Sequence, residues 1–343
     1  MRDIEPQQVR KILVREVNWV GDAILTLPAL EALDRRFPSA EIVVSGRPWV
    51  LGIFRGQPSV DRLLAFDSAE RHRGLRGRWR LAGEIRQERF DLAVVFPNSM
   101  DAALVPWLAA IPRRVGYPTD GRGLLLTHPV KETPRPTERH QVFRYLGLAR
   151  ALGGEADGVP RLHVTADAVM EADRLLAGHG VPPDAVCIAV NPGSVYGSAK
   201  RWPADRFALV ADHLARQWKA RVLLVGSARE TGVLDAVARV MKEPSISLGG
   251  RTSIAVLPGL LRRARLLLTN DTGAMHVAAA VGTPVLAVFG PTDAVATGPL
   301  GPRAAIVETS VPCSPCLLRE CPIDHRCVQG VTVGQVIRAA EAM

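Results

Sequence analysis

The sequence predicts an α/β protein of two domains, each built on a parallel β-sheet with helices on its faces. Three observations carry this expectation. The chain has 343 residues, which is too long for one ordinary core and fits two domains of about 150 residues each. Short β-branched runs alternate with longer helical stretches, the pattern of parallel strands joined by helices. Both halves open in the same way, with an apolar strand, a glycine-containing turn and a helix.

The first half supplies five candidate strands and three candidate helices. The strands are expected at Lys11–Arg15, Glu41–Ser45, Arg62–Phe66, Leu92–Phe96 and Arg113–Gly116. The helices are expected at Ala29–Arg36, at Arg80–Arg89 and from about Arg139 to Leu152, where two glycines follow. Pro28 predicts that the helix after the first strand either kinks there or begins only near Thr26. Two prolines within Lys131–Thr137 predict an extended loop.

The second half repeats the pattern. Strands are expected at Val186–Val190, Arg221–Val225, Ser245–Leu248, Arg265–Thr269 and Val285–Phe289, and a helix at Arg206–Trp218. A cluster of glycines and prolines near residues 178–183 suggests a boundary. We therefore expect an N-terminal domain at 1–170 and a C-terminal domain at 171–343, with a last helix that could pack back on the first. Ligands of open α/β sheets bind at the carboxyl ends of the strands, which predicts a cleft between the domains.

The composition bounds location and partners. No stretch approaches the roughly 18–20 continuous apolar residues of a membrane span, and Met1 to Arg10 lacks the apolar core of a secretory signal. A cytoplasmic protein is expected. The net charge of +9 favours an acidic partner such as a phosphorylated substrate or an anionic membrane surface. Arginines concentrate at Arg71, Arg73, Arg76, Arg78 and Arg80; a solvated basic surface explains them equally well. No nucleic-acid motif accompanies this charge, so nucleic acid is not an expected partner.

The strongest local signal is the junction at Asn270-Asp271-Thr272-Gly273. An apolar strand runs directly into this turn and then into an alanine-rich helix. Such a junction points free backbone N–H groups and the positive end of the helix dipole at a ligand, and phosphate is the natural guest. The alternative is that Asp271 or Thr272 only caps the helix. A second strand-end loop on the same edge, through Phe289 to Asp293, strengthens the pocket interpretation.

Two further loops follow predicted strands. Asn191 to Pro203 is rich in small residues before Lys200, which can lie against a diphosphate as a point charge; a flexible surface loop is the alternative. Asn18 to Leu30 places Asp22 at the start of a helix, where a carboxylate could take the proton from an attacking hydroxyl. A helix-start acid that only favours the dipole explains Asp22 equally well.

Several absences narrow the chemistry. The sequence contains neither G-x-x-x-x-G-K-[ST] nor G-x-G-x-x-G, which argues against kinases, ATPases and dehydrogenases. It also contains no Asp-x-Asp pair, a simple way to hold a divalent ion on a diphosphate. A bound sugar nucleotide would then rely on the helix dipole and Lys200 to stabilise the leaving group. No cofactor is expected to be required.

The cysteines fall into two groups. Cys187 lies in a predicted buried strand and is expected to be a small core residue. The other four crowd together near the C-terminus, at Cys313, Cys316, Cys321 and Cys327. A Cys-x-x-Cys pair followed by two more cysteines could hold a structural zinc ion, although the spacing is tighter than in ordinary zinc ribbons. Reduced thiols or a redox-labile pair are the alternatives.

Taken together, these motifs resemble a known family over nearly the whole chain. The matching segments are Trp19-Val20-Gly21-Asp22, Ile111 to Tyr117, Asn191-Pro192-Gly193 through Lys200-Arg201-Trp202-Pro203, Asn270 to Gly273 with Met275-His276, Phe289-Gly290-Pro291 and the cysteine cluster. The sequence is similar to the lipopolysaccharide heptosyltransferases, glycosyltransferase family 9, and within them to the type II branch.

The resemblance implies a fold, a reaction and site residues. The fold would be the GT-B architecture, two Rossmann-like domains facing across a cleft. The enzyme would be inverting, would take heptose from ADP-heptose bound by the C-terminal domain, and would pass it to the heptosyl-Kdo inner core of lipopolysaccharide bound by the N-terminal domain. Asp22 would be the general base. The donor contacts would be Lys200, Glu230, Asp271, Thr272, Gly273, Ala274 and His276, with a looser match at Glu230.

The acceptor side is implied less directly. The acceptor carries carboxylates and phosphates, which gives Arg113, Arg114 and the Arg71–Arg80 cluster a partner, together with the anionic inner leaflet of the membrane where a lipid-linked acceptor resides. The alternatives are a type I transfer to Kdo, another GT-B sugar-nucleotide enzyme such as an epimerase, and a non-enzymatic module that binds nucleotide sugars.

Overall fold

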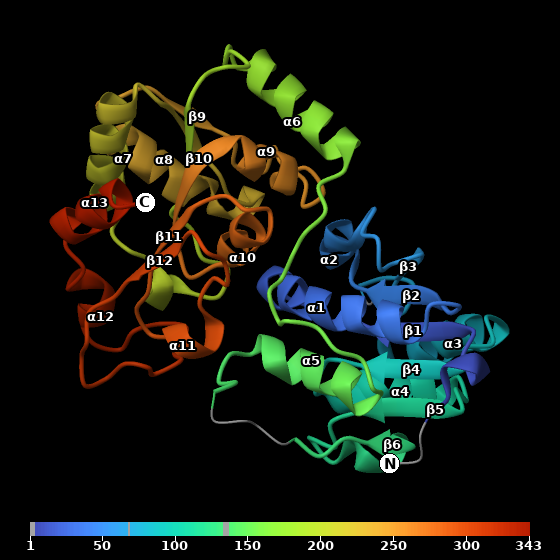
Figure 1. Ribbon diagram of the computed structural model, residues 1–343. Helices are drawn as coiled ribbons and strands as arrows, with labels where there is room; N and C mark the ends of the chain where they lie inside the picture. The colour runs from blue at the N-terminus through green and yellow to red at the C-terminus, as the bar shows by residue number, and fades with distance from the viewer. Residues whose placement is uncertain (1–3, 68, 133–136) are drawn as a thin grey trace. The chain divides into compact units, whose positions relative to one another are not determined.

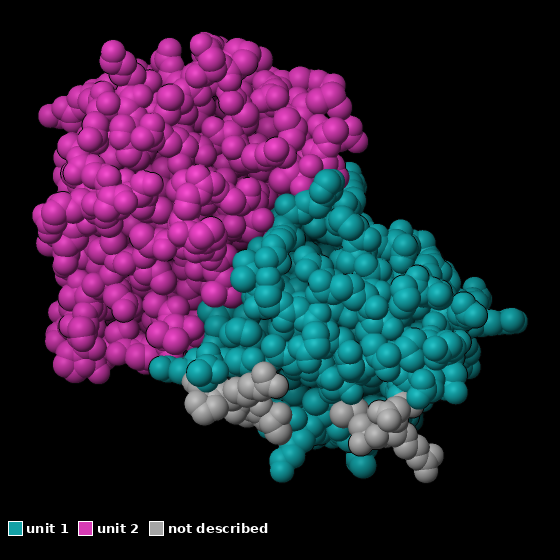
Figure 2. All heavy atoms as spheres, viewed as in Figure 1, with its two compact units in different colours: residues 1–163 teal, residues 164–343 magenta. Residues whose placement is uncertain are grey.

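The chain forms two compact units, each an α/β structure. The computed structural model describes residues 4–67, 69–132 and 137–343, and the units are Met1–His163 and Val164–Met343 (Figure 2). Each unit contains one six-stranded sheet in which all neighbouring strands are parallel. The predicted α/β fold class is therefore confirmed. The boundary expected after residue 170 lies within α6 (Ala166–Gly178), the first helix of the second unit.

The sheet of the N-terminal unit has the order β3-β2-β1-β4-β5-β6. The strands are β1 (Lys11–Arg15), β2 (Glu41–Gly46), β3 (Arg62–Ala65), β4 (Leu92–Val95), β5 (Arg113–Gly116) and β6 (His128–Pro129). The α-helices are α1 (Val20–Arg36), α2 (Pro48–Leu51), α3 (Gly74–Gln87), α4 (Met100–Leu108) and α5 (Val142–Ala151). Helices α1 and α5 lie side by side, as do α3 and α4 (Figure 1).

Two expectations for this unit need comment. Helix α1 runs from Val20 to Arg36 with Pro28 inside it, so the predicted late start is wrong. Burial explains the difference, because residues 23–30 of α1 are all buried. Their packing stabilises the helix by more than the loss of the one backbone hydrogen bond that proline removes. The loop predicted at Lys131–Thr137 lies largely outside the described residues, which stop at 132 and resume at 137.

The sheet of the C-terminal unit has the order β12-β11-β10-β7-β8-β9. The strands are β7 (Cys187–Asn191), β8 (Arg221–Leu224), β9 (Ser245–Ser247), β10 (Ala264–Asn270), β11 (Val285–Val288) and β12 (Ala304–Val307). The α-helices after α6 are α7 (Ala204–Trp218), α8 (Thr231–Val240), α9 (Leu257–Arg263), α10 (Gly273–Ala280), α11 (Ala294–Thr297), α12 (Arg326–Gln329) and α13 (Val333–Glu341). Helix α13 packs against α7 and β12 of its own unit (Figure 1).

The topology of each sheet creates one place where ligands are expected. In the N-terminal unit the chain leaves β1 toward β2 on one side, and β4 lies on the other side. In the C-terminal unit β7 has β8 on one side and β10 on the other. Connections that diverge in this way open a crevice at the carboxyl ends of the two central strands. A site is therefore expected in the segments that follow β1 and β4 and in those that follow β7 and β10.

Within the described ranges, no helix is long and apolar enough to cross a membrane.

Candidate active site

Asn270 ties together the two loops that leave β7 and β10. Its side chain is fully buried. Its Nδ2 donates to the carbonyl oxygens of Pro192, at 2.8 Å, and Gly193, at 3.1 Å, while its Oδ1 accepts from the Trp202 N–H at 3.0 Å. Three bonds from one buried amide fix the loop of residues 192–202 against the start of α10. The sequence indicated a turn at this position but not this connection.

The N-terminus of α10 is not capped by a side chain. The residue before the helix is Thr272, whose backbone is extended and whose side chain makes no capping hydrogen bond. Its Oγ1 donates instead to Asn191 Oδ1 at 3.1 Å. The interpretation of Asp271 or Thr272 as a helix cap is therefore wrong. The first amides of α10, beginning at Gly273, and the positive end of the helix dipole remain available to an anion.

Lys200 and Asp271 form a buried ion pair at the same place. Lys200 Nζ lies 2.5 Å from Asp271 Oδ2, and the two side chains are only 12% and 7% exposed. Thr292 Oγ1 donates to the same carboxylate oxygen at 2.6 Å. The ammonium group also lies 4.7 Å from the centroid of the Tyr196 ring. Three loops that leave strands β7, β10 and β11 thus contribute to one charged cluster.

Glu230 faces the loop after β7 from the neighbouring strand end. It follows β8, is 6% exposed, and its Oε2 accepts from Ser227 N–H at 2.8 Å and Ser227 Oγ at 2.7 Å. A Cβ placed on Gly193 would come within 2.1 Å of Glu230 Oε1. The carboxylate therefore rests against the glycine, and only a residue without a side chain fits there. His276, the remaining predicted donor contact, is buried in α10.

The C-terminal cysteines are all free thiols. Cys313 and Cys316 are exposed and Cys327 is buried; burial raises the pKa of the Cys327 thiol. Within the part of the chain that the structure describes, no group of three or more residues is arranged to hold a metal ion. Cys187 is buried in β7, as predicted.

The segment that carries the cysteines supports the loop that follows β7. Tyr196 Oη donates to the Leu317 carbonyl at 2.7 Å, and the Ala199 N–H donates to the Arg319 carbonyl at 3.0 Å. Because Tyr196 also contacts the Lys200 ammonium, this segment helps to fix the ion pair.

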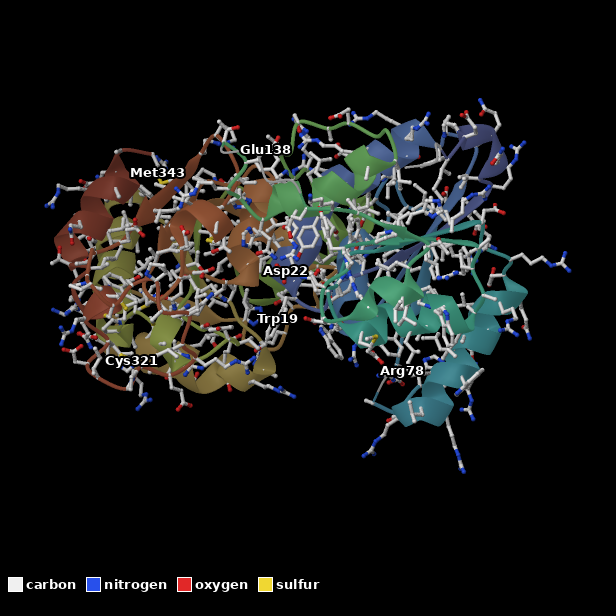
Figure 3. All side chains as sticks on the ribbon, turned by 90° about the horizontal axis from the view of Figure 1, so that it is seen from below. Trp19, Asp22, Arg78, Glu138, Cys321 and Met343 are labelled. Atoms are coloured by element: carbon white, nitrogen blue, oxygen red, sulfur yellow. The ribbon has the colours of Figure 1, made fainter. Side chains whose placement is uncertain are left out.

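In the N-terminal unit, Asp22 lies in the first turn of α1, near Trp19 (Figure 3). Gln141, just before α5, donates through Nε2 to Asp22 Oδ1 at 2.7 Å. The same nitrogen donates to Tyr145 Oη at 2.8 Å. Sequence analysis missed Gln141 and Tyr145, because nothing in the local pattern of α5 indicates a partner on α1.

Two buried charged residues at the end of β1 were also missed. Glu16 is fully buried; burial raises the pKa of its carboxyl group to about 8, and its Oε1 has no hydrogen-bond partner among the described residues. Arg15 is 4% exposed and burial lowers its pKa to about 10. Its guanidinium group donates to the Ser45 carbonyl at 3.1 Å and lies 4.5 Å from the centroid of the Phe66 ring.

Arg113 and Arg114 do not join Asp22. They open β5, in register with Leu92 and Ala93 at the start of β4, so they lie at the amino ends of the strands whereas Asp22 follows the carboxyl end of β1. Arg113 donates to Gln8 Oε1 at 2.9 Å, and Arg114 donates to the carbonyls of Leu125, at 2.7 Å, and Ile111. Both guanidinium groups thus support nearby loops.

The Arg71–Arg80 cluster is split by its contacts. Arg78 (Figure 3) points inward and pairs with Asp101 at 2.6 Å, and Arg71 pairs with Glu84 at 2.7 Å. The outward face of α3 carries Leu75, Arg76, Trp79 and Arg80, all exposed. The four buried residues of the helix, Gly77, Leu81, Ala82 and Ile85, lie on its other face.

Comparison with known proteins supports one family. The sequence model of the family described as glycosyltransferase family 9 (heptosyltransferase) matches residues 78–326. The chain is 31% identical to a lipopolysaccharide heptosyltransferase 2 from Salmonella typhimurium, over 87% of this chain and 88% of that protein.

Solved structures agree on the fold. The crystal structure of a family 9 glycosyltransferase from Veillonella parvula has a TM-score of 0.88 at 25% identity, covering 99% of this chain and 98% of that one. The structure of the Escherichia coli ADP-heptose lps heptosyltransferase II has a TM-score of 0.82 at 27% identity, covering 97% and 98%. The predicted GT-B fold is thereby confirmed for both Rossmann-like units. The chain belongs to glycosyltransferase family 9, the heptosyltransferases, and is a glycosyltransferase.

Proposed function

We propose that this protein moves L-glycero-D-manno-heptose from ADP-heptose to the heptosyl-Kdo inner core of lipopolysaccharide, with inversion at the anomeric carbon. The observation that carries the proposal is the uncapped N-terminus of α10 beside the Lys200–Asp271 ion pair. The printed names of similar proteins, a lipopolysaccharide heptosyltransferase 2 and an ADP-heptose heptosyltransferase II, support the sugar and the branch.

The donor is proposed to bind entirely through the C-terminal unit. The diphosphate sits at the amides of Gly273 and Ala274, where the helix dipole stabilises negative charge. Lys200 turns its ammonium group to the leaving phosphate, and Asp271 and Thr272 contact the heptose side of the donor. Glu230, whose carboxylate rests against Gly193, accepts hydrogen bonds from the ribose hydroxyls, and His276 completes the contacts from α10.

Asp22 is proposed as the general base. An acceptor hydroxyl attacks the anomeric carbon from the face opposite ADP, the bond from that carbon to the ADP oxygen breaks, and the hydroxyl proton passes to the Asp22 carboxylate. An aspartate is a weak base, so the proton transfers late, once attack on the oxocarbenium-like centre has acidified the hydroxyl. Negative charge on the departing ADP meets the α10 amides and Lys200, preorganised donors of the kind that usually contribute most to such a barrier. No metal ion takes part in this scheme.

The outward face of α3 is proposed to contact the anionic membrane in which a lipid-linked acceptor resides. Leu75 and Trp79 are one helical turn apart and are 74% and 62% exposed. Arg76 and Arg80 flank them on the same face. Tryptophan with arginine on one side of a helix is typical of segments that lie in the membrane interface. Arg113 and Arg114 are left out of the acceptor site, because their guanidinium groups bond to the protein's own oxygens.

The function is tested by incubating the purified protein with ADP-heptose and Kdo-lipid acceptors that carry zero or one heptose, with products read by mass. We expect a gain of one heptose only on the acceptor that already carries one. Gain only on the heptose-free acceptor would assign the type I reaction instead. A reaction without acceptor that isomerises the donor would assign an epimerase, and no conversion at all would leave a binding module.

A further inference from the structure

The Asp22 carboxylate is held by a side chain from another helix. Gln141 lies immediately before α5, which packs beside α1 (Figure 1). Its Nε2 carries two hydrogens, and both are directed to acceptors: one to Asp22 Oδ1 at 2.7 Å and one to Tyr145 Oη at 2.8 Å. The contact spans 119 positions of sequence, so only the tertiary structure creates it.

Tyr145 holds this amide in place. Its side chain is 5% exposed, and its ring packs edge-on against Phe96 with centroids 5.7 Å apart. If the Gln141 amide turned over, its carbonyl oxygen would face the Asp22 carboxylate, and two acceptors would oppose each other. The carboxylate, which can only accept, therefore selects the N–H end of the amide, and the tyrosine hydroxyl accepts its second N–H and holds the amide in place.

We infer that Gln141, held by Tyr145, is a positioning residue that orients the Asp22 carboxylate for proton transfer. The inference rests on the proposed function, because it gives Gln141 a role only if Asp22 is the base. An N–H donor stabilises an ionised carboxylate more than the protonated acid, so Gln141 keeps Asp22 in the form that can accept a proton. It also restricts the rotation of a side chain that has to meet the acceptor hydroxyl within hydrogen-bond distance.

Two ionisable groups interact with Asp22 besides Gln141. Glu16 at the end of β1 has its pKa raised to about 8 by burial, and burial likewise raises the pKa of Tyr145 well above its ordinary value. Both are therefore neutral near pH 7. The other titratable or charged groups on the segment packed against α1 are Glu138, Arg139, His140, Arg144 and Arg150.

The test uses three variants and one matched control. Gln141→Met keeps the length of the side chain and removes the donor, Gln141→Glu replaces the donor by an acceptor, and Tyr145→Phe removes the hydroxyl that holds Gln141. Tyr117→Phe is the control, because Tyr117 is also a buried tyrosine but its Oη donates to the Arg144 carbonyl at 2.7 Å. The pH profiles of kcat and of KM for ADP-heptose are measured for each.

For Gln141→Met we expect kcat to fall about 10- to 100-fold, with the donor KM unchanged, and the acidic limb of the kcat profile to move to higher pH. Gln141→Glu should move that limb further, because a second carboxylate favours protonation of the first. Tyr145→Phe should give a smaller shift in the same direction, and Tyr117→Phe none.

A Gln141→Met enzyme with wild-type kcat and an unmoved acidic limb would overturn the inference. So would an equal loss of rate at every pH in all three variants, which is the mark of a merely structural role. If Gln141→Met fails to fold, the inference is tested by the acidic limb of the kcat profile of Tyr145→Phe, which keeps the ring packing. Asp22→Asn, measured in parallel, distinguishes failure of this inference from failure of the proposed function. If Asp22→Asn is inactive and Gln141→Met is unaffected, only the positioning role is rejected. If Asp22→Asn keeps full activity, Asp22 is not the general base.

Discussion

Glu16 is a carboxyl group that folding forces away from water. Burial raises its pKa from the ordinary 4.5 to about 8, so the folded protein binds a proton that the unfolded chain has released between these two pH values. This proton stabilises the folded state. The stabilisation is fully present below about pH 4.5 and is lost as the pH rises through about 8. A difference of one pKa unit corresponds to about 1.4 kcal/mol.

Glu16→Gln should remove this dependence on pH. The amide has the size of the protonated acid and cannot ionise, so we expect the variant to match the wild type near pH 5 and to unfold at a higher temperature than the wild type at pH 8.5. Thermal unfolding measured at both pH values tests this, with the exposed Glu70→Gln as control. A gap in Tm that does not widen with pH would show that Glu16 does not carry the proton.

Gly193 has no room for a side chain. A Cβ at this position would meet Glu230 Oε1 at 2.1 Å, so Gly193→Ala must displace the carboxylate that is proposed to bind ribose. We expect the KM for ADP-heptose to rise about tenfold, the loss of a hydrogen bond to a charged group, with a smaller change in kcat. Gly232→Ala is the matched control, since a Cβ there meets nothing within 4 Å. Equal KM values for the two variants would remove Glu230 from the donor site.

The two faces of helix α3 differ in character. Its inner face belongs to the core with Leu81, Ala82 and Ile85, while the outer face exposes an apolar pair among arginines. Each basic residue near an anionic surface contributes about 1 kcal/mol of binding. The double variant Arg76→Glu/Trp79→Ala should therefore bind vesicles of phosphatidylglycerol and phosphatidylethanolamine at least about tenfold more weakly in sedimentation.

The control for α3 makes the same change of charge elsewhere and also removes an exposed apolar side chain there. Arg174→Glu/Leu209→Ala alters an exposed arginine on α6 and an exposed leucine on α7, and we expect it to bind vesicles as the wild type does. Vesicles of phosphatidylcholine alone should bind neither the wild type nor either double variant. Equal loss in both double variants would mean that only net charge, and not this face, attracts the protein.

The elements that sequence could predict are those whose signal is local. The central strands β1, β7 and β10 were found because strands covered on both faces read as continuous apolar runs, and their burial confirms it. The edge strands β3 and β9 were expected, but β6 and β12 were not, because β6 has only two residues and β12 begins with two alanines, which have a low strand propensity. The turn at Asn270 could be predicted from its strand and helix, whereas Gln141 could not, since its meaning lies in a contact with α1.

At the scale of the whole molecule, the proposed donor contacts and the proposed base belong to different units. All residues proposed for the donor belong to Val164–Met343, and Asp22 belongs to Met1–His163. A bound ligand stabilises the structure that holds it against local opening. ADP should therefore slow amide hydrogen exchange in residues 191–203 and 270–276 and leave β1 to β5 of the other unit unchanged.

The exchange experiment is read peptide by peptide with mass spectrometry, and inorganic phosphate at the same concentration serves as the control ligand. Slower exchange in residues 191–203 and 270–276 with ADP but not with phosphate is the expected result. Protection confined to the N-terminal unit would place the nucleotide in the wrong half of the protein.

The Lys200–Asp271 pair has a consequence for which ligands the site tolerates. An empty site whose cation is already neutralised has little attraction for the phosphate and sulfate ions that surround it in a cell. A ligand has to replace both partners, because taking Lys200 alone leaves Asp271 as an uncompensated buried charge. In the proposed site the intact donor offers a phosphate to Lys200 and sugar hydroxyls to Asp271, whereas spent ADP offers only the phosphate. If the donor binds as proposed, the pair favours loading of the substrate over retention of the product.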